Sequence, residues 1–474
     1  MLGAGPTGLS AAWRLEELGH RSWDLYEAGP VSGGLAASVM DEQGFTWDHG
    51  CHVLHSHYAY VDALMEAALG DDWVEHVRET WVWLRQRWIR YPLQNNIWRL
   101  PTNDVARCLD GLLVSVLANG NGKSVHTFED WLRASFGSGI HEIFMEPYNR
   151  KVWGYPTEHL GVGWMRDRVA QVDVRRVARN VVLQEDDDGW GPNATFRYPL
   201  RGGTGAIWRS LAEQLPAERL HFGSRVVAVH ASRRTLVLED GREVTYDHLI
   251  CTMPLDRLLS IITDVPELRA FTGQFIRTST HVVGVGFQGP TPPELRSKSW
   301  MYFPELDTPF HRVSVHSNYS PFNVPCPGAQ WSLLAEIGES PLKPIDGRTV
   351  VEDTLAGFYR CGLVPAGTAI VSRWHRRLEY GYPTPWLGRE EVLAPVNDAL
   401  ERLCIFSRGR FGAWKYEVSN QDHSVMQGAE VVERILRGGT EFTFCGDMRD
   451  SLLPSSGSRI GPPMLGPRKM RRGV

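Results

Sequence analysis

Four histidines and one cysteine lie close together in the stretch WDHGCHVLHSHY, residues 47–58. Imidazole and thiolate groups at short spacing can bind a metal ion, and imidazoles beside a bound cofactor can also exchange protons. No downstream C-x-x-C or H-x-x-x-H motif completes a tetrahedral metal site. An extended strand would point His52 away from the face shared by the other four side chains: His49, Cys51, His55 and His57. The spacing argues against a metal site, and it leaves open what else the segment borders.

A glycine-rich turn at the start of the chain indicates that the protein binds a dinucleotide cofactor. The segment MLGAGPTGLSAAWRLEELGH contains G-x-G-x-x-G at Gly3, Gly5 and Gly8, followed by an apolar helical pattern. Such glycines permit a tight turn, a close approach of backbone to pyrophosphate, and packing of helix on strand. The run SWDLYEAG predicts a second strand ending at Glu27, 19 residues after Gly8, where a carboxylate can accept hydrogen bonds from a ribose. The glycines that follow favour a flavin over NAD: Gly33 and Gly34, with Leu35.

The strand that should precede Gly3 is represented only by Met1 and Leu2. In dinucleotide-binding folds the first strand lies in the middle of the parallel sheet, and a strand has about five or six residues. We therefore expect the reading frame to begin upstream of Met1.

The composition is that of a globular protein with two or three domains. The chain has 474 residues and a formal net charge of -5, which gives no general attraction to nucleic acid or to an anionic membrane. Its seven cysteines are widely spread and no apolar run approaches about 18 residues, so disulfide frameworks and membrane spans are not expected. These features predict a soluble protein in the cytoplasm.

Three further patterns suggest the organisation of the chain. The motif T-x-x-D at Thr127 predicts the start of a helix within a mainly helical region. Alternating apolar residues with a turn at Asp240-Gly241 predict a β-meander over 225–254, shortly after a second glycine-rich turn that includes Gly203. Several strand-like runs between 275 and 375 predict an antiparallel sheet.

Six blocks resemble, in order, those of the eukaryotic type of UDP-galactopyranose mutases. They are GFTWDHGCHVLHSHY, YPLQNN, EPYNRKVW, GWGPNATFRYPLRGGTGAIW, HRRLEYGYPTP and GRFGAWKYEVSNQDHS, and the resemblance extends to about residue 437. It implies an α/β fold, with an FAD-binding Rossmann-like domain, an inserted helical domain and an antiparallel β-sheet domain. The expected segments are the FAD-binding domain in three parts (1–85, 201–262 and 401–450), a strand segment near the uridine site (86–100), the helical domain (101–188), a flap and strand (189–200), the antiparallel sheet domain (263–400) and a disordered tail (451–474).

The resemblance also implies an activity. The family interconverts UDP-galactopyranose and UDP-galactofuranose without net redox change, through a bond between N5 of reduced flavin and the sugar. FAD is the implied cofactor, NAD(P)H the implied external reductant and a UDP-sugar the implied partner. No nucleic acid or membrane partner is expected, and the oligomeric state is not indicated.

The matching positions imply site residues. The catalytic set comprises His52 at the flavin edge, Arg312, Arg410 and Asn420. The cofactor-binding set comprises Gly3, Gly5, Gly8, Glu27, Gly33, Gly34, Leu35, His52, His57, Gly203 and Gln421. The substrate-binding set comprises Tyr91, Gln94, Asn149, Trp153, Arg168, Asn193, Trp300, Tyr302, Arg312, Tyr319, Tyr382, Arg410, Tyr416 and Asn420, with Arg168 and Asn193 on flaps.

Three positions depart from the family pattern, and they leave alternatives open. Cys51 stands where the family has a glycine, His55 replaces an aromatic residue, and Leu93 stands where a phenylalanine would pack on the base. We therefore expect slower or differently specific turnover. A flavin oxidase of the amine oxidase type shares the glycine-rich turn and the meander but has no need of diphosphate-binding arginines. A protein that binds flavin and UDP-sugar with little turnover is the other alternative.

Overall fold

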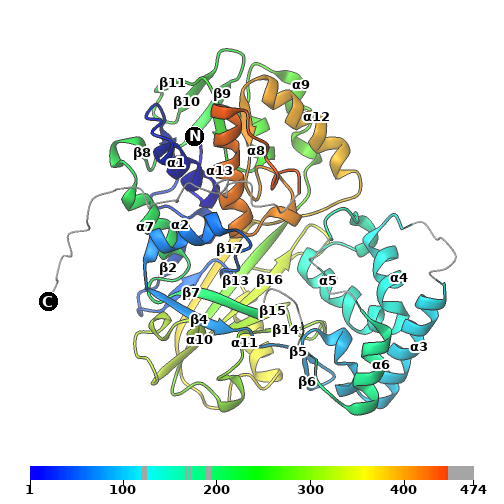
Figure 1. The fold of residues 1–474 in the computed structure, drawn as a ribbon. Helices are drawn as coiled ribbons and strands as arrows, with labels where there is room; N and C mark the ends of the chain where they lie inside the picture. The colour runs from blue at the N-terminus through cyan, green and yellow to red at the C-terminus, as the bar shows by residue number, and fades with distance from the viewer. Residues whose placement is uncertain (119–124, 166–168, 170–171, 188, 190–193, 447–474) are drawn as a thin grey trace.

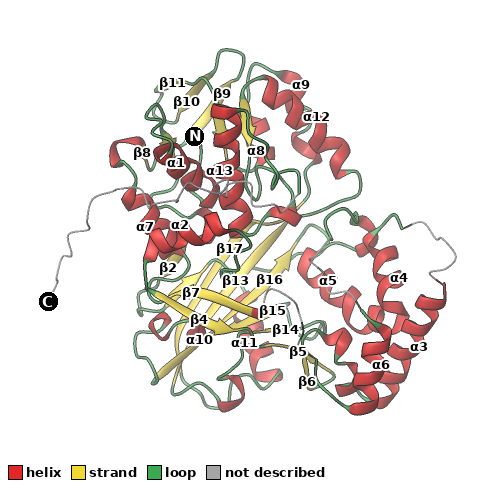
Figure 2. Ribbon diagram, in the orientation of Figure 1, coloured by secondary structure: helices red, strands yellow, loops and turns green. Residues whose placement is uncertain are grey.

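The computed structural model describes residues 1–118, 125–165, 169, 172–187, 189 and 194–446 (Figure 1). Helices gather around short parallel strands in the upper part of the view, a long sheet lies below them, and a group of helices lies to one side (Figure 2). Among the described residues, no helix combines the length and apolar character needed to cross a membrane.

The dinucleotide-type part is built around two pairs of parallel strands. Strand β1 (Leu25–Tyr26) pairs with β8 (Leu220–His221), and β12 (Leu249–Cys251) pairs with β18 (Ile405–Ser407). Leu2 forms parallel bridges to both Tyr26 and Cys251, so the start of the chain lies in the middle of this sheet, as expected. Four helices cover it: α1 (Pro6–Glu17), α2 (Ala59–Leu69), α7 (Gly205–Gln214) and α13 (Gln421–Arg437).

The β-meander predicted after the second glycine-rich turn is confirmed. Strand β10 (Thr235–Leu238) pairs antiparallel with β9 (Val226–His230) and with β11 (Glu243–Thr245), and Gly241 has a φ of +86° at the predicted turn. Nearby lie α8 (Leu255–Ile261), α9 (Pro266–Arg269) and α12 (Arg389–Arg402). Helix α12 packs with the strands of this part through Leu393, Val396 and Leu400, although it follows the long sheet in sequence.

The long sheet has seven strands in the order β17-β13-β16-β15-β14-β5-β6. Its pairs are antiparallel, as predicted, except that β14 and β5 run parallel. The exception arises because β5 comes from a distant part of the chain, so no hairpin fixes its direction. The bounds are β5 (Thr80–Leu84), β6 (Arg87–Arg90), β13 (Arg277–Gln288), β14 (Trp300–Tyr302), β15 (Arg312–Val315), β16 (Gln330–Glu339) and β17 (Ile370–Pro383).

Shorter elements connect these parts. Helix α11 (Val350–Arg360) covers one face of the long sheet, and two small antiparallel pairs are β2 (Ser38–Met40) with β3 (Thr46–Asp48), and β4 (Trp73–Val77) with β7 (Thr195–Pro199). Helix α10 (His316–Tyr319) follows β15. After β6, the segment predicted as strand continues as two 3₁₀ turns, η2 (Leu93–Asn95) and η3 (Ile97–Arg99).

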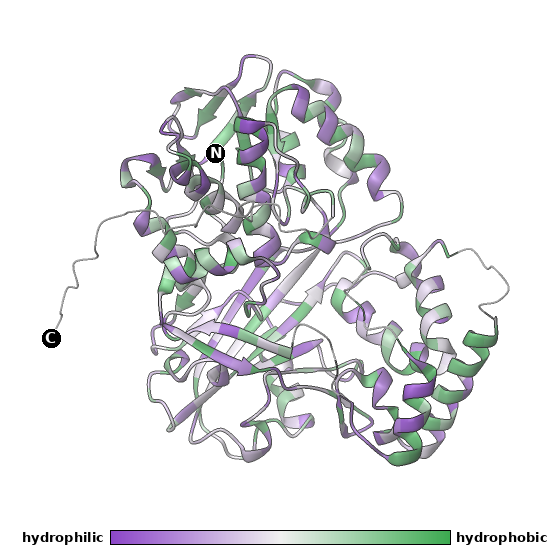
Figure 3. Ribbon diagram, viewed as in Figure 1, coloured by the Kyte–Doolittle hydropathy of each residue, from purple (hydrophilic) through white to green (hydrophobic). Residues whose placement is uncertain are grey.

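The helical part contains α3 (Thr102–Ala118), α4 (Phe128–Ile140), a π-helical turn η5 (His141–Met145), α5 (Glu146–Trp153) and α6 (Val174–Leu183). The predicted start of α4 is confirmed. The Thr127 side chain accepts a hydrogen bond from the Asp130 amide, and the Asp130 carboxylate accepts one from the Thr127 amide. The C-terminal half of α3 exposes the apolar side chains of Leu113, Val114, Val116 and Leu117. Green ribbon on the outer side of the helical part marks its hydrophobic residues (Figure 3).

Candidate active site

A cavity of about 610 Å³ joins the dinucleotide-type part to the long sheet. Its lining combines the glycine-rich turn and the end of β1 with side chains from β13, β15, β16 and β17 and from the loop before α13. The predicted residues that line it are Gly3, Gly5, Glu27, Gly34, Leu35, His52, Trp300, Arg312, Tyr382, Arg410, Tyr416, Asn420 and Gln421.

The glycine-rich turn has the backbone that its sequence predicts. Gly3 has a φ of +98°, and a Cβ atom there would lie 2.2 Å from Thr252 Oγ1. A Cβ at Gly8 would lie 1.9 Å from the Gly3 carbonyl oxygen, so Gly8 serves packing and does not line the cavity. A Cβ at Gly5 would approach only the Gly33 carbonyl oxygen, at 4.0 Å, which leaves room for a ligand beside it.

Glu27 and the second pair of glycines surround this turn. The carboxylate of Glu27 accepts hydrogen bonds from the amides of Ala4 (2.8 Å) and Gly29 (2.7 Å). Gly33 has a φ of +106° and donates its amide to the Ala4 carbonyl (2.8 Å), while Gly34 and Leu35 face the cavity.

The histidine segment is irregular, so the prediction of an alternating strand was wrong. Strand β3 ends at Asp48, Gly50 takes a φ of +130°, and only Leu54 forms a bridge, to Arg197. His52 nevertheless lines the cavity, as the resemblance implies. Burial lowers the pKa of His52 to about 4, and its Nδ1 has no hydrogen-bond partner among the described residues.

Asp48, the residue before the histidine segment, is held in place by several hydrogen bonds. Its carboxylate accepts hydrogen bonds from Ser38 Oγ (2.5 Å), Tyr198 Oη (2.7 Å) and the Thr204 amide (3.1 Å). Thr204 Oγ1 also donates to the His52 carbonyl (2.7 Å), and a Cβ at Gly203 would lie 2.5 Å from Asp48. Gly203 thus supports the histidine segment from behind and does not line the cavity.

His57 lies beside the N-terminus of α13. Its Nδ1 is 2.7 Å from Asp422 Oδ2, and its ring stacks on His423 with centroids 6.1 Å apart. Burial raises the pKa of Asp422, but His423 and His57 lower it by more. The ligand atoms of these three residues lie within 4.8 Å of one another, which is a spacing that could hold a metal ion. Sequence spacing did not reveal this group, and the absence of a metal site stays a prediction.

Arg312 and Glu336 form a buried ion pair in the cavity wall. Arg312 Nε and Nη2 each donate to Glu336, over 2.7 Å. Burial would raise the pKa of Glu336, but the charge and hydrogen bonds of Arg312 lower it to about 2. The Cys51 amide also donates to Glu336 Oε1 (3.0 Å). The sequence analysis missed Glu336, whose only signal is an acid in the interior of the buried strand β16.

Arg410 enters the same cavity from the loop before α13. Its Nη2 donates to the Gly381 carbonyl (2.9 Å) and its Nη1 to Ser419 Oγ (2.9 Å). The guanidinium carbon lies 5.1 Å from the ring centroid of Tyr382. Asn420, the N-cap residue of α13, lines the cavity beside it.

Aromatic residues extend the site beyond the cavity lining. Trp153 packs against Tyr416 with ring centroids 4.8 Å apart, and Tyr91 packs against Tyr302 at 4.9 Å. Tyr302 Oη accepts a hydrogen bond from Trp300 Nε1 (2.8 Å). The predicted substrate residues that do not line the described cavity are Tyr91, Gln94, Asn149, Trp153, Tyr302 and Tyr319.

Gln94 is 1% exposed in the turn after β6. Asn149 Nδ2 donates to the carbonyl of Met145, the last residue of the π-helical turn before α5 (2.7 Å). Arg78, which the sequence analysis did not single out, has its guanidinium carbon 5.5 Å from the Tyr91 ring centroid and 5.6 Å from that of Trp300. Arg168 and Asn193 lie outside the described residues.

The structure resembles a crystal structure of reduced UDP-galactopyranose mutase. The two chains are 46% identical, the match covers 94% of each chain, and the TM-score is 0.91. This chain belongs to the UDP-galactopyranose mutase family.

The chain also belongs to a wider family, the flavin containing amine oxidoreductases, whose pattern it matches over residues 6–310. A putative protoporphyrinogen oxidase from Exiguobacterium sp. 255-15 is 16% identical, with coverage of 92% of this chain and 97% of that chain and a TM-score of 0.67. A redesigned putrescine oxidase is likewise 16% identical, with coverage of 92% and 98% and a TM-score of 0.61. At such identities the likeness shows the fold alone, whereas the mutase match supports the resemblance drawn from the sequence blocks.

Proposed function

We propose that this protein is a flavin-dependent mutase that interconverts UDP-galactopyranose and UDP-galactofuranose. One observation carries the proposal: a dinucleotide-type turn and two partly buried arginines, Arg312 and Arg410, line the same cavity. A sugar nucleotide with its diphosphate on these arginines would place its sugar against the cofactor. An amine substrate has no diphosphate and would make no use of these two guanidinium groups.

The residues at the turn fit FAD. The open space beside Gly5 suits a pyrophosphate at the N-terminus of α1, and Glu27 at the end of β1 suits a ribose. His52, with an unpartnered buried Nδ1, suits a ring that carries polar atoms. When bound, reduced flavin would supply the nucleophile for the anomeric carbon of the sugar.

The chain's own residues bind and orient the nucleotide. Arg312 and Arg410 would hold the diphosphate while it leaves the sugar and while it returns, because guanidinium groups match phosphate oxygens in geometry and charge. Tyr382 lies beside Arg410 and Tyr416 packs against Tyr382, and both hydroxyl groups can donate hydrogen bonds to the same oxygens. The pair of Tyr91 and Tyr302 would bind the uridine. Gln94 follows Tyr91 closely in the sequence, and Asn149 is next to Tyr148, whose ring packs against Tyr302.

His52 would contact the cofactor as a neutral side chain. Because burial lowers its pKa to about 4, its imidazole is neutral at neutral pH. A neutral ring at this position can exchange one hydrogen bond through Nδ1 without repelling the cationic arginines that bind the leaving group.

We further propose that NAD(P)H reduces the flavin and that Arg168 and Asn193 close over the sugar. The resemblance of the sequence blocks supports both proposals. A cytoplasmic location also stays a prediction.

Turnover of the furanose substrate tests the proposal. Purified, flavin-loaded protein would be incubated with UDP-galactofuranose, with and without dithionite, and the products separated by chromatography. We expect UDP-galactopyranose only under reducing conditions. Conversion at the same rate with oxidised flavin would contradict the proposal, and tight UDP binding without any conversion would favour the alternative of a binding protein.

A further inference from the structure

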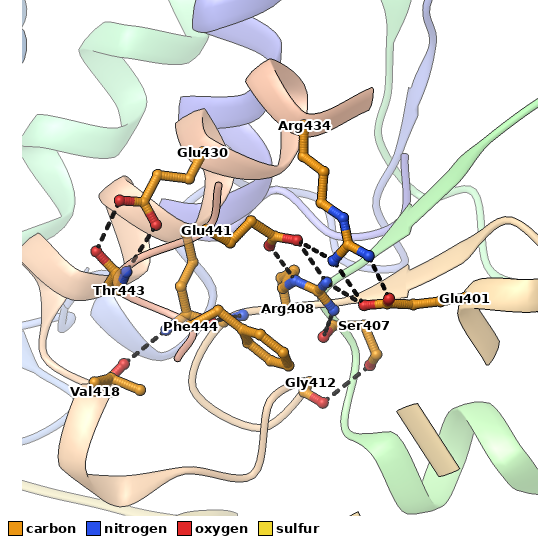
Figure 4. A network of polar contacts seen from close by, with 12 residues as sticks. Glu401, Ser407, Arg408, Gly412, Val418, Glu430, Arg434, Glu441, Thr443 and Phe444 are labelled. Atoms are coloured by element: carbon orange, nitrogen blue, oxygen red, sulfur yellow. Dashed lines mark hydrogen bonds and ion pairs between the residues drawn. The ribbon is translucent and has the colours of Figure 1, made fainter. Parts of the chain in front are cut away.

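The segment that follows α13, residues 440–446, lies against the loop that carries Arg410 (Figure 4). Within this segment, the buried Glu441 carboxylate accepts hydrogen bonds from Arg408 Nη2 (2.8 Å) and from Arg434 Nη1 (2.7 Å), and it also binds Arg408 Nε. The ring centroid of Phe444 lies 3.8 Å from the Arg408 guanidinium carbon. The segment therefore holds Arg408 through both a charge and an aromatic face.

Arg408 is a fully buried cation, with 0% of its side chain exposed. Its remaining donors bind Glu401 Oε1 (2.6 Å) and the Ser407 carbonyl (2.9 Å). Arg434 links the two carboxylates, because it also donates to Glu401 Oε2 (2.5 Å). Loss of Glu441 would leave two arginines to share one carboxylate, and such an imbalance is costly in a buried site.

The same loop is held at both ends. At its start, the Arg408 amide donates to the Cys251 carbonyl (2.9 Å), next to the buried guanidinium. At its end, Lys415 Nζ donates to the Phe444 carbonyl (3.2 Å). Arg410 lies between these two fixed points, so the position of its backbone depends on the segment after α13.

We propose that Glu441 is a positioning residue that sets the place of Arg410 in the cavity. The inference rests on the proposed role of Arg410 as a ligand of the diphosphate. Glu441 reaches no residue of the cavity lining through the contacts described above, so its effect on the nucleotide passes through Arg408 and the loop.

A double-mutant cycle tests this inference in the oxidised, FAD-loaded enzyme. The dissociation constant of UDP would be measured by calorimetry for wild type, Glu441→Gln, Arg410→Ala and the double variant. We expect Glu441→Gln to raise this constant about fivefold to tenfold, because small displacements of a binding group are costly. In the Arg410→Ala background the same change should alter the constant by less than about twofold.

Glu433→Gln is the matched control. Glu433 lies on the same helix that precedes Glu441 and accepts a hydrogen bond from Arg14 Nε (2.8 Å), which joins α13 to α1. The partners of its carboxylate, Arg14 and Arg437, are not part of the Arg410 loop. We expect this variant to lower the melting temperature without changing the dissociation constant of UDP. Phe444→Leu, which keeps every charge, serves where Glu441→Gln does not fold, and we expect a rise of about threefold.

The outcomes separate the inference from the function on which it rests. If Arg410→Ala leaves UDP binding unchanged, the role of Arg410 fails and the inference fails with it. If Arg410→Ala weakens binding while Glu441→Gln and Phe444→Leu do not, only the inference is overturned. Equal effects of Glu441→Gln in both backgrounds would also overturn it, because they would indicate a general loss of structure. In turnover assays the expected change is a higher KM with kcat altered less.

Discussion

The Sγ atom of Cys51 lies 3.2 Å from the hydroxyl oxygen of Tyr319. Both side chains belong to an apolar group beside the cavity that also contains Phe196, Tyr198 and Trp300. Burial raises the pKa of the Cys51 thiol. The position that is a glycine in the family pattern therefore carries a neutral side chain packed into the wall of the site.

This packing leads to the first prediction, that Cys51→Gly raises turnover. We assume that the peptide at residues 50–51 changes conformation when the cofactor is reduced. A glycine reaches left-handed backbone angles freely, whereas other residues pay about 1–2 kcal/mol, so the gain in kcat is expected to reach about tenfold. Cys51→Ala is the control, because it removes the thiol and keeps Cβ. An alanine variant as fast as the glycine variant would contradict the role of the backbone.

The second prediction concerns Glu336→Gln, which should destabilise the protein by about 3 kcal/mol at pH 7, because it leaves the partly buried Arg312 without its charged partner. The folded-state pKa of Glu336 is about 2, below the ordinary value of 4.5. The ionised Glu336 carboxylate therefore adds its full share to the free energy of unfolding above pH 4.5, and this share is lost as the pH falls toward 2. Urea unfolding at several pH values checks this. Wild type and variant should converge in acid, and a constant difference down to the lowest accessible pH would contradict it.

The third prediction concerns acid sensitivity from His311. Its side chain is 1% exposed, and burial lowers its pKa from 6.5 to about 3. Between these two pH values, His311 binds a proton in the unfolded chain but not in the folded protein. The free energy of unfolding therefore falls as the pH drops below 6.5. Between pH 6.5 and 5 the loss should reach up to about 2 kcal/mol, and His311→Asn should reduce this slope. His159→Asn, at an exposed site, should leave it unchanged, and an unaltered slope in His311→Asn would contradict the assignment.

The fourth prediction tests the aromatic pair at the proposed uridine site. Tyr91→Ala should weaken UDP binding by about tenfold or more, because it removes a ring on which a base can stack, while Tyr91→Phe should stay within about twofold. Calorimetric titration with UDP measures both. Tyr359→Ala, an exposed tyrosine on α11, is the control for a general effect of the substitution. A Phe variant as weak as the Ala variant would show that the hydroxyl group matters and not the ring.

Local sequence signals predicted those parts of the fold that depend on neighbouring residues. The glycine-rich turn, the cap at Thr127 and the turn at Gly241 all follow from backbone requirements that a few residues satisfy together. The resemblance then placed His52, Arg312 and Arg410 in one cavity, where the structure also has them.

Contacts between distant parts of the chain were not predictable in this way. Glu336 pairs with Arg312, which lies on the adjacent strand. Asp422 contacts His57, which is 365 positions away in the sequence. The left-handed angle of Gly50 ends the regular strand before the histidines, and alternation of side chains cannot be assumed beyond it. These relationships come from tertiary packing, which no short motif encodes.

The Glu336 Oε1 atom accepts from both the Cys51 amide and Arg312 Nε. One oxygen atom thus connects the peptide next to His52 with the cation assigned to the leaving nucleotide. If that peptide turned away when the cofactor gained electrons, the oxygen would lose one donor and bind the guanidinium alone. Affinity for the nucleotide and the reduction potential of the cofactor would then be thermodynamically linked, each altering the other by the same free energy.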